Sequence, residues 1–261
     1  MLKKRIIPMM LLLDGRLVKT CQFDTWRNVG DPVKSASVYN SQYTDELVLL
    51  NINRELRSIT QLAQLIPEIA QVSFMPLAVG GGINCFNDAA YLINQGADKI
   101  IINSAAYQKI DLVRQITSKF GQQAVIVSID VKLDNSTKDN HLSKAHYQLY
   151  SNCGQQLESI SLERHIKQCQ EAGAGEFMIQ SINHDGMMAG FDIALFQRVM
   201  TLAKVPVIGC SGSGNYQHLR EAFIDTDISA LGCGSLFNFS DSNPIRAKNY
   251  LTNYNIAFKK V

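Results

Sequence analysis

The sequence predicts an α/β protein, a (β/α)8 TIM barrel built as two similar half-barrels. Eight short apolar segments alternate with longer segments of helical period, which is the pattern of strand followed by helix. The length of 261 residues suits one such barrel, so we expect a single domain over residues 1–261. Several matches between the two halves at one offset indicate the two-fold internal repeat.

Each predicted strand is apolar at almost every position instead of alternating with polar residues. This composition is typical of parallel strands that are buried on both faces. The eight strands are predicted at residues 5–11, 46–52, 75–81, 99–103, 124–130, 176–182, 205–211 and 228–234.

Helices are predicted in the segments between these strands. Residues 58–72 place their apolar side chains along one helical stripe. Residues 87–96 end on Gly96, a typical C-terminal cap, and residues 161–175 begin with Ser161, a typical N-cap.

The repeat is visible when the chain is shifted by 130 residues. Residues 45–53 then align with residues 175–183, and residues 103–105 with residues 233–235. Glu46 meets Glu176 within the first of these alignments, and the same shift superposes two further pairs, Pro76 with Pro206 and Gly82 with Gly212. Several matches at a common offset are improbable by chance, so we interpret them as two halves of four βα units.

Composition narrows the functional class. The net charge of +2 and the pI of about 8.2 are too mild to indicate a nucleic-acid or membrane partner. No apolar segment reaches the roughly 20 residues needed to cross a bilayer, and none of the six cysteines forms a C-x-x-C pair. We therefore expect a soluble cytoplasmic protein with free thiols, no metal and no cofactor.

The longest irregular segment, residues 131–159, follows the fifth predicted strand. A loop at this place lies on the C-terminal face of a barrel, where active sites are found. Residues 146–150 are predicted to form a short hairpin strand within it. A functional loop and a variable surface excursion both fit the sequence.

Two glycine-rich loops, residues 79–84 and 210–215, come directly after strands and before predicted helices. Backbone N–H groups in such turns bind anions, and barrels bind phosphate there. The repeat predicts two such sites, one for each end of a bisphosphate, although tight turns without a ligand are the alternative. The candidate phosphate-binding residues are Gly81, Gly82, Asn103, Ser104, Gly212, Gly234 and Ser235.

Three polar residues near strand ends are candidates for chemistry. Asp130 ends the fifth strand, where a carboxylate can act as a general acid or base; a helix cap or a salt bridge to Lys132 is the alternative. Lys19, after the first strand, could hold a phosphate or polarise a substrate oxygen. Asp185, after the sixth strand, is a further candidate, with capping of its own turn as the alternative.

Charged residues stand immediately before four of the apolar segments, at the opposite end of the predicted barrel. They are Arg5, Glu46, Lys99 and Glu176. Two cations and two anions could close that end as a ring of ion pairs, although solvated strand ends would give the same pattern.

These motifs together resemble one known family, the cyclase subunit of imidazole glycerol phosphate synthase. The resemblance covers nearly the whole chain and rests on short motifs along it. They include KRIIP, DGRLVK, GDPV, DELV, VGGGI, GADK, INSAA, SID, GAGE, GSGN, SLF and the DG of Asp185 and Gly186.

The resemblance implies a barrel that pairs with a glutaminase subunit and acts as a lyase on a bisphosphorylated ribulosyl aminoimidazole carboxamide. It implies that ammonia enters through a gate formed by Arg5, Glu46, Lys99 and Glu176, and that Asp98 lies at the partner interface. It further places Asp185 and Gly186 at a phosphate site, and makes Asp130 and Lys19 catalytic.

The chain departs from the family pattern at the end of the first strand. Leu11 stands where the family has its first catalytic aspartate; Asp14 is close in sequence but lies in the loop. Asn51 and Asn183 also replace acids. Three hypotheses follow: a cyclase; a cyclase-deficient paralogue that supplies ammonia for amidination of a nucleotide-linked sugar, with a sugar amidotransferase as partner; and a phosphoribosyl isomerase, which needs no ammonia.

Overall fold

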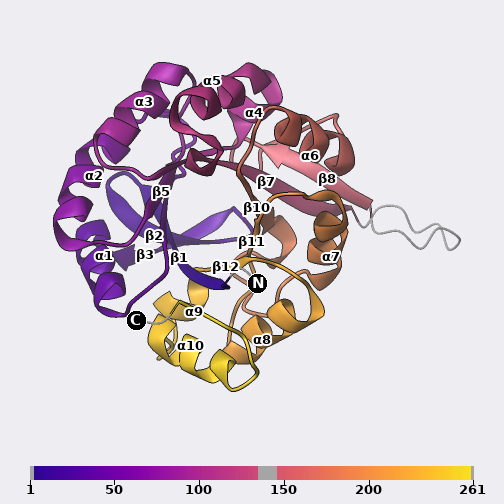
Figure 1. Cartoon of the computed structure of the whole chain (residues 1–261). Coiled ribbons are helices and arrows are strands. Elements are labelled where there is room, and N and C mark those ends of the chain that lie inside the picture. Colours follow the sequence, from indigo (N-terminus) through magenta and orange to yellow (C-terminus); the bar gives the residue numbers. More distant parts are fainter. Residues whose placement is uncertain (1–2, 135–145, 260–261) are drawn as a thin grey trace, which may run out of the picture.

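The computed structural model describes residues 3–134 and 146–259, which fold into a closed parallel barrel (Figure 1). Neighbouring strands pair in parallel around the ring, and the last strand pairs with the first, so the ring of eight parallel strands is closed. In order around the barrel the strands are β1 (Arg5–Leu13), β4 (Leu47–Asn51), β5 (Leu77–Gly80), β6 (Lys99–Ile102), β7 (Val125–Asp134), β10 (Glu176–Ser181), β11 (Val207–Cys210) and β12 (Ala230–Cys233). Each of the eight predicted strands is confirmed.

Helices cover the outside of the barrel on all sides (Figure 1). The predicted helices are present as α2 (Thr60–Val72), α3 (Phe86–Asn94) and α6 (Leu162–Glu171), and the Ser161 hydroxyl accepts a hydrogen bond from the Arg164 N–H as an N-cap does. The other helices are α1 (Pro32–Ser41), α4 (Ser104–Gln108), α5 (Ile110–Phe120), α7 (Ile193–Leu202), α8 (Tyr216–Asp225), α9 (Ser235–Asn238) and α10 (Pro244–Thr252), with short 3-10 turns η1 (Gln122–Ala124) and η2 (Ile182–His184). Within the described ranges, no helix is long and apolar enough to cross a membrane.

The apolar residues form two separate clusters because every barrel strand has one face toward the helices and one toward the barrel axis. The larger cluster packs the helices on the outside of the sheet and includes Phe177 and Phe196. The smaller cluster fills the barrel interior and includes Ile7, Val48 and Met178. Burial on both faces explains why the strands are apolar along their whole length.

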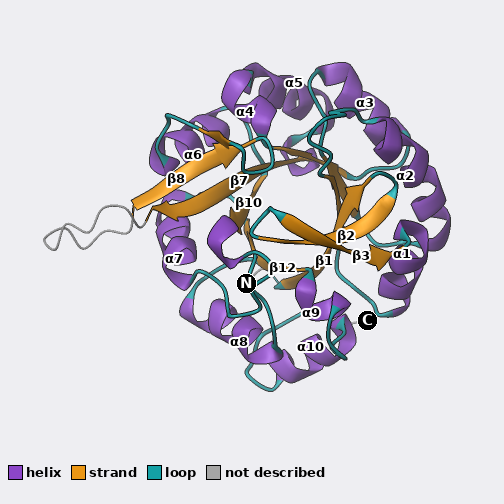
Figure 2. Cartoon of the chain, turned by 180° about the vertical axis from the view of Figure 1, so that it is seen from behind, coloured by secondary structure: helices purple, strands orange, loops and turns teal. Residues whose placement is uncertain are grey.

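Two hairpins are added to the C-terminal ends of barrel strands. β2 (Arg16–Cys21) pairs with β1 and with β3 (Thr25–Gly30), and this hairpin lies across the barrel mouth (Figure 2). β8 (His146–Ser151) pairs with β7 and with β9 (Gln156–Leu157). The second hairpin confirms the short strand predicted at residues 146–150. Residues 135–145 of the long loop lie outside the described residues.

The two halves of the barrel repeat their hydrogen bonds as well as their sequence. The Leu47 N–H donates to the Pro76 carbonyl over 2.9 Å, and 130 residues later the Phe177 N–H donates to the Pro206 carbonyl over 3.0 Å. The loops after β5 and β11 also share a left-handed turn, with φ of +79° at Gly82 and +112° at Gly212. The internal repeat is therefore a property of the backbone.

Candidate active site

A pocket of about 550 Å³ opens at the C-terminal ends of the strands. Its wall includes all the predicted catalytic and phosphate-binding residues, from both halves of the barrel. This is the face at which barrel enzymes bind their substrates. The structure thus brings together residues that are far apart in sequence, from Lys19 to Ser235.

The glycines of the first predicted phosphate loop are required by close backbone contacts. Gly81 has φ of +98°, and a Cβ built on it would lie 2.0 Å from the Asn51 carbonyl oxygen. A Cβ on Gly82 would lie 2.8 Å from the Ser58 carbonyl oxygen. The loop after β5 therefore packs directly against the loop after β4, which leaves bare backbone at the pocket wall.

The second predicted loop is built in the same way on the opposite half. A Cβ on Gly212 would lie 2.0 Å from the Gly190 carbonyl oxygen, and a Cβ on Gly234 would lie 3.0 Å from Lys19 Cε. Ser235 Oγ is buried and has no hydrogen-bond partner among the described residues. An unpaired buried hydroxyl at the pocket wall is suited to bind a ligand oxygen.

Asn103 and Ser104 follow β6 and complete the first predicted phosphate site, together with the glycine loop after β5. The Asn103 side chain donates to the Ser128 carbonyl over 3.1 Å, and the Ser104 hydroxyl accepts a hydrogen bond from the Asn152 N–H over 3.1 Å. Because that bond uses the hydroxyl oxygen as an acceptor, the hydroxyl hydrogen can be donated elsewhere, to Asn103 Oδ1 at 3.4 Å or to a ligand.

Asp130 is buried at the pocket floor. Its Oδ1 accepts hydrogen bonds from Gln180 Nε2 at 3.0 Å and from Ser128 Oγ at 3.4 Å. Burial raises the pKa of the Asp130 carboxyl to about 7, even though these two hydrogen bonds lower it. Lys132 lies instead over the Tyr150 ring, and Asp130 lies within β7, so Asp130 is neither a partner of Lys132 nor a helix cap. A carboxyl that titrates near neutrality can give or take a proton.

Lys19 and Asp185 are joined by a buried ion pair. Lys19 Nζ lies 2.6 Å from Asp185 Oδ1, and the Thr20 hydroxyl donates to Asp185 Oδ2 over 2.6 Å. Gly186 follows with φ of +74°, and a Cβ there would lie 2.4 Å from the Thr20 carbonyl oxygen. The loop after β10 is therefore fixed to strand β2, with a cation at the pocket wall beside Gly234.

At the end of β1, Leu11 stands where the resemblance implies an acid, and the nearest acid, Asp14 in the following turn, also lines the pocket. The Leu11 side chain faces the barrel axis, is 9% exposed and packs with the interior apolar cluster. Asp14 is exposed and accepts a hydrogen bond from Asn53 Nδ2 over 2.7 Å. Asn51 donates to the Ser58 carbonyl, and the Asn183 side chain accepts from the Leu133 N–H. Both asparagines thus hold loops.

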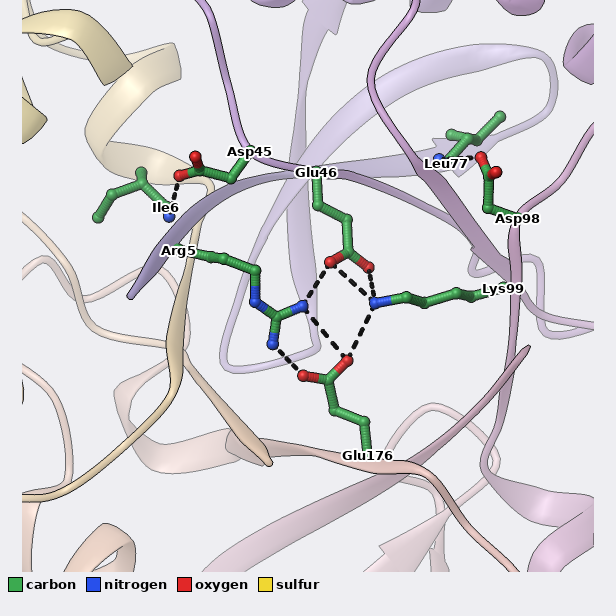
Figure 3. Close-up of polar contacts among 8 residues, drawn as sticks. All are labelled: Arg5, Ile6, Asp45, Glu46, Leu77, Asp98, Lys99 and Glu176. Carbon is green, nitrogen blue, oxygen red and sulfur yellow. Dashed lines mark hydrogen bonds and ion pairs between the residues drawn. The ribbon is translucent and has the colours of Figure 1, made fainter. Parts of the chain in front are cut away.

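The four predicted charges meet in a closed ring at the other end of the barrel, with cation and anion alternating (Figure 3). Arg5 Nη1 lies 2.6 Å from Glu46 Oε2, and Lys99 Nζ lies 2.8 Å from Glu46 Oε1 and 3.2 Å from Glu176 Oε2. Arg5 also binds Glu176 directly. Burial lowers the pKa of Arg5, but the two carboxylates outweigh it, so the net pKa is raised. The strand-end charges are therefore a ring, and the solvated alternative is wrong.

Asp98 lies next to this ring on the same face (Figure 3). It is exposed, and its Oδ2 accepts a hydrogen bond from the Leu77 N–H over 2.8 Å. A shallow hollow of about 200 Å³ lies beside it, lined in part by Phe74 and Pro76. The Phe74 side chain is 87% exposed.

Sequence reasoning missed Gln180 and Ser128, the two residues that hold Asp130. A signal for both was available, because alternate residues of a barrel strand share a face. Ser128 lies two residues before Asp130 on β7, and Gln180 lies opposite Asp130 in the register of β10 with β7. Among the described residues, no group of three or more His, Cys, Asp or Glu side chains is arranged to hold a metal ion.

Comparison with known proteins agrees with this geometry. A profile of the family described as histidine biosynthesis protein matches residues 5–242. The imidazole glycerol phosphate synthase subunit HisF of Staphylococcus carnosus is 36% identical over 251 residues, which cover 96% of each chain. The subunit of the same name from Staphylococcus aureus strain MRSA252 is 40% identical over 230 residues, 88% of each chain. With matches over most of its length, this chain belongs to the histidine biosynthesis protein family and to its HisF-like members.

Proposed function

We propose that this chain is the cyclase-type subunit of imidazole glycerol phosphate synthase, a lyase of histidine biosynthesis that uses ammonia from a glutaminase partner. The observation that carries the proposal is the pairing of two features in one barrel. A closed ionic ring lies at the N-terminal end, and a pocket with glycine loops from both half-barrels lies at the C-terminal end. The names of the relatives support the same activity.

In this proposal ammonia crosses the barrel interior between the two ends. It is lined by apolar side chains, among them Ile7, Val48, Ile126, Met178 and Ile208. An apolar passage disfavours charged ammonium and admits neutral NH3, which is the nucleophilic form. The ring of Arg5, Glu46, Lys99 and Glu176 would then act as the entrance gate. A phosphoribosyl isomerase needs no ammonia, so the ring disfavours that alternative.

The glutaminase subunit would dock on the face that carries the ring. Asp98 supplies an exposed carboxylate there, and Phe74 supplies a large exposed apolar side chain beside it. Exposed aromatic residues with a polar rim are typical of protein interfaces. This face therefore combines the entrance with a surface for the protein that would supply ammonia.

The pocket would hold the bisphosphate substrate by its two ends. The loops with Gly81, Gly82, Asn103 and Ser104 would bind one phosphate. The other phosphate would bind at Asp185–Gly186, Gly212, Gly234 and Ser235, where the unpaired Ser235 hydroxyl and the Lys19 cation face the pocket. Asp130 would lie between them as the proton donor and acceptor, and Lys19 would polarise a substrate oxygen.

One observation favours a second function, ammonia delivery without cyclisation. Leu11 and Asp130 line the same pocket from strands that stand halfway around the barrel from each other, and Leu11 occupies the place where the resemblance implies the first of two catalytic aspartates. Loss of a general acid or base costs about 10²–10⁴ in rate. In this alternative the ammonia would amidinate a nucleotide-linked sugar together with a sugar amidotransferase.

A single assay separates the two functions. The purified chain is incubated with the authentic bisphosphate and an ammonium salt at alkaline pH, and imidazole glycerol phosphate is measured, with Asp130→Asn as the negative control. Turnover that depends on Asp130 supports the cyclase. If wild type is inactive and Leu11→Asp gains at least about 100-fold, the cyclase proposal is wrong and the ammonia-delivery function stands.

A further inference from the structure

The carboxyl of Asp130 is held asymmetrically, by one oxygen only. Oδ1 accepts from Gln180 Nε2 at 3.0 Å and from Ser128 Oγ at 3.4 Å. The same Gln180 nitrogen also donates to Ser128 Oγ at 3.2 Å, so the three side chains form a closed triangle. Among the described residues, both hydrogen bonds to the carboxyl fall on Oδ1 and none on Oδ2, while Asp130 itself lines the pocket.

The backbone fixes this triangle in place. Ser128 and Asp130 are two residues apart on β7 and face the barrel axis together, and Gln180 stands opposite Asp130 in the pairing of β10 with β7. Side chains on neighbouring strands at the same level are close enough to interact without rearrangement. The contact is therefore built into rigid strands, and it does not depend on a loop.

We propose that Gln180, with Ser128 behind it, is a positioning residue that binds Oδ1 of Asp130 and leaves Oδ2 to exchange protons with the ligand. An amide N–H can only donate, so Gln180 favours the ionised carboxylate and obliges an incoming proton to sit on Oδ2. The inference deepens the proposed function and rests on it for the role of the proton in catalysis.

Other titratable groups lie around the pocket near Asp130, and their charge states must be considered when its titration is interpreted. Asp185 raises the pKa of Asp130, but Asp185 is paired with Lys19. The thiols of Cys153 and Cys210 and the Tyr107 hydroxyl have pKa values raised by burial and by Asp130, so they are neutral near pH 7. None of these groups hydrogen-bonds to the Asp130 carboxyl; within the described part of the chain, only Gln180 and Ser128 do so.

The test measures the titration of Asp130 itself, without substrate. Protein labelled with ¹³C at the aspartate carboxyl carbons is titrated by NMR, and Asp130→Asn assigns the signal. Gln180→Met keeps the length of the side chain and removes the donor. In this variant the pH midpoint of the Asp130 titration is expected to rise by roughly one pH unit or more above wild type. Ser128→Ala is expected to give a smaller rise, because its bond is longer.

Gln148→Met is the matched control. Gln148 donates to Asp134 over 2.9 Å, outside the barrel interior, so the Asp130 midpoint should not move. Should Gln180→Met fail to fold, Gln180→Leu likewise removes the donor without adding a charge, and the same rise is expected. An Asp130 midpoint unchanged in the folded Gln180 variant, or raised equally by Gln148→Met, would overturn the inference.

The titration also separates this inference from the proposed function. If the protein shows no cyclase turnover but the midpoint shifts as expected, the positioning of Asp130 stands and the cyclase function fails. If turnover is present, its pH profile should shift upward with the Asp130 midpoint in Gln180→Met. Turnover with a profile that does not move would contradict the positioning role.

Discussion

Two residues at the ends of opposite strands determine what the pocket can do. Leu11 on β1 and Asp130 on β7 both face the barrel axis, four strands apart around the closed sheet. Leu11 adds apolar surface to the pocket that Asp130 also lines, and burial is what raises the pKa of Asp130 to about 7. Among the carboxyls that line the pocket, Asp130 is therefore the one whose pKa burial raises to about 7.

The raised pKa predicts how Asp130 affects stability with pH. The unfolded chain loses this proton near pH 4, whereas the folded chain keeps it until about pH 7. The folded state binds more protons over this window, so its stability falls as pH rises from 4 to 7 and stays lower above it. Asp130→Asn removes the ionisable group and therefore the fall in stability with pH. The variant should be more stable than wild type at pH 8, by up to about 4 kcal/mol, and little different from it at pH 4.

Urea unfolding of both proteins at each pH measures this difference. Asp111→Asn serves as the control, because the Asp111 side chain is 75% exposed and should show no comparable change between pH 4 and pH 8. A constant difference between Asp130→Asn and wild type at all pH values would mean that Asp130 ionises normally in the folded protein.

At the scale of the element, the glycine loops are held by backbone contacts as well as by backbone conformation. Gly212 and Gly96 both have strongly positive φ, +112° and +117°. A Cβ on Gly212 would meet the Gly190 carbonyl oxygen at 2.0 Å, whereas a Cβ on Gly96 would meet only side-chain carbons at 3.6 Å and beyond. A side chain would therefore be strained by the backbone conformation at both positions, but only at Gly212 would its Cβ also clash with a neighbouring backbone atom.

This pair gives a direct prediction about loop packing. Gly96→Ala should cost about 1–2 kcal/mol, the strain of a left-handed alanine, and Gly212→Ala should cost a further 1–3 kcal/mol as the loops after β10 and β11 move apart. Thermal or urea unfolding compares the two variants. Equal losses would show that the contact with Gly190 is easily relieved.

The elements were predictable to different degrees, for a physical reason. The barrel strands are buried on both faces, so they can be recognised in the sequence as continuous apolar segments. The β2–β3 hairpin was missed because β3 is almost wholly exposed and carries polar residues such as Arg27 and Asn28, which have no strand periodicity. Its existence depends on pairing with β2, which is a tertiary contact.

At the scale of the molecule, closing the barrel is what creates the ionic ring. Glu46 and Glu176 are buried, and each carboxylate contacts both Arg5 and Lys99. Such a gate should matter only for ammonia that enters through the barrel. Ammonium in solution would reach the C-terminal pocket directly from its open mouth.

Glu46→Gln therefore should lower glutamine-supported turnover of the complex more than ammonium-supported turnover, since one anion of the gate is lost while the pocket is intact. The ratio of the two rates, with bisphosphate as substrate, is the measurement. Asp227→Asn, which alters an ion pair whose acid is 90% exposed, should leave the ratio unchanged. Equal losses of both rates in Glu46→Gln would contradict the role of the ring as an entrance.

The sequence by itself determined the eight strands, the half-barrel repeat and the residue types at the strand ends, because burial on both faces and close backbone contacts restrict which side chains are possible. The resemblance to the cyclase family further implies that Leu11 stands where that family has an acid. Only the tertiary structure decided that Gln180 and Ser128 hold Asp130, that Lys19 pairs with Asp185, and that the four strand-end charges close into a ring. Those contacts join strands that are distant in sequence, and only the register of the closed barrel places their side chains at the same level.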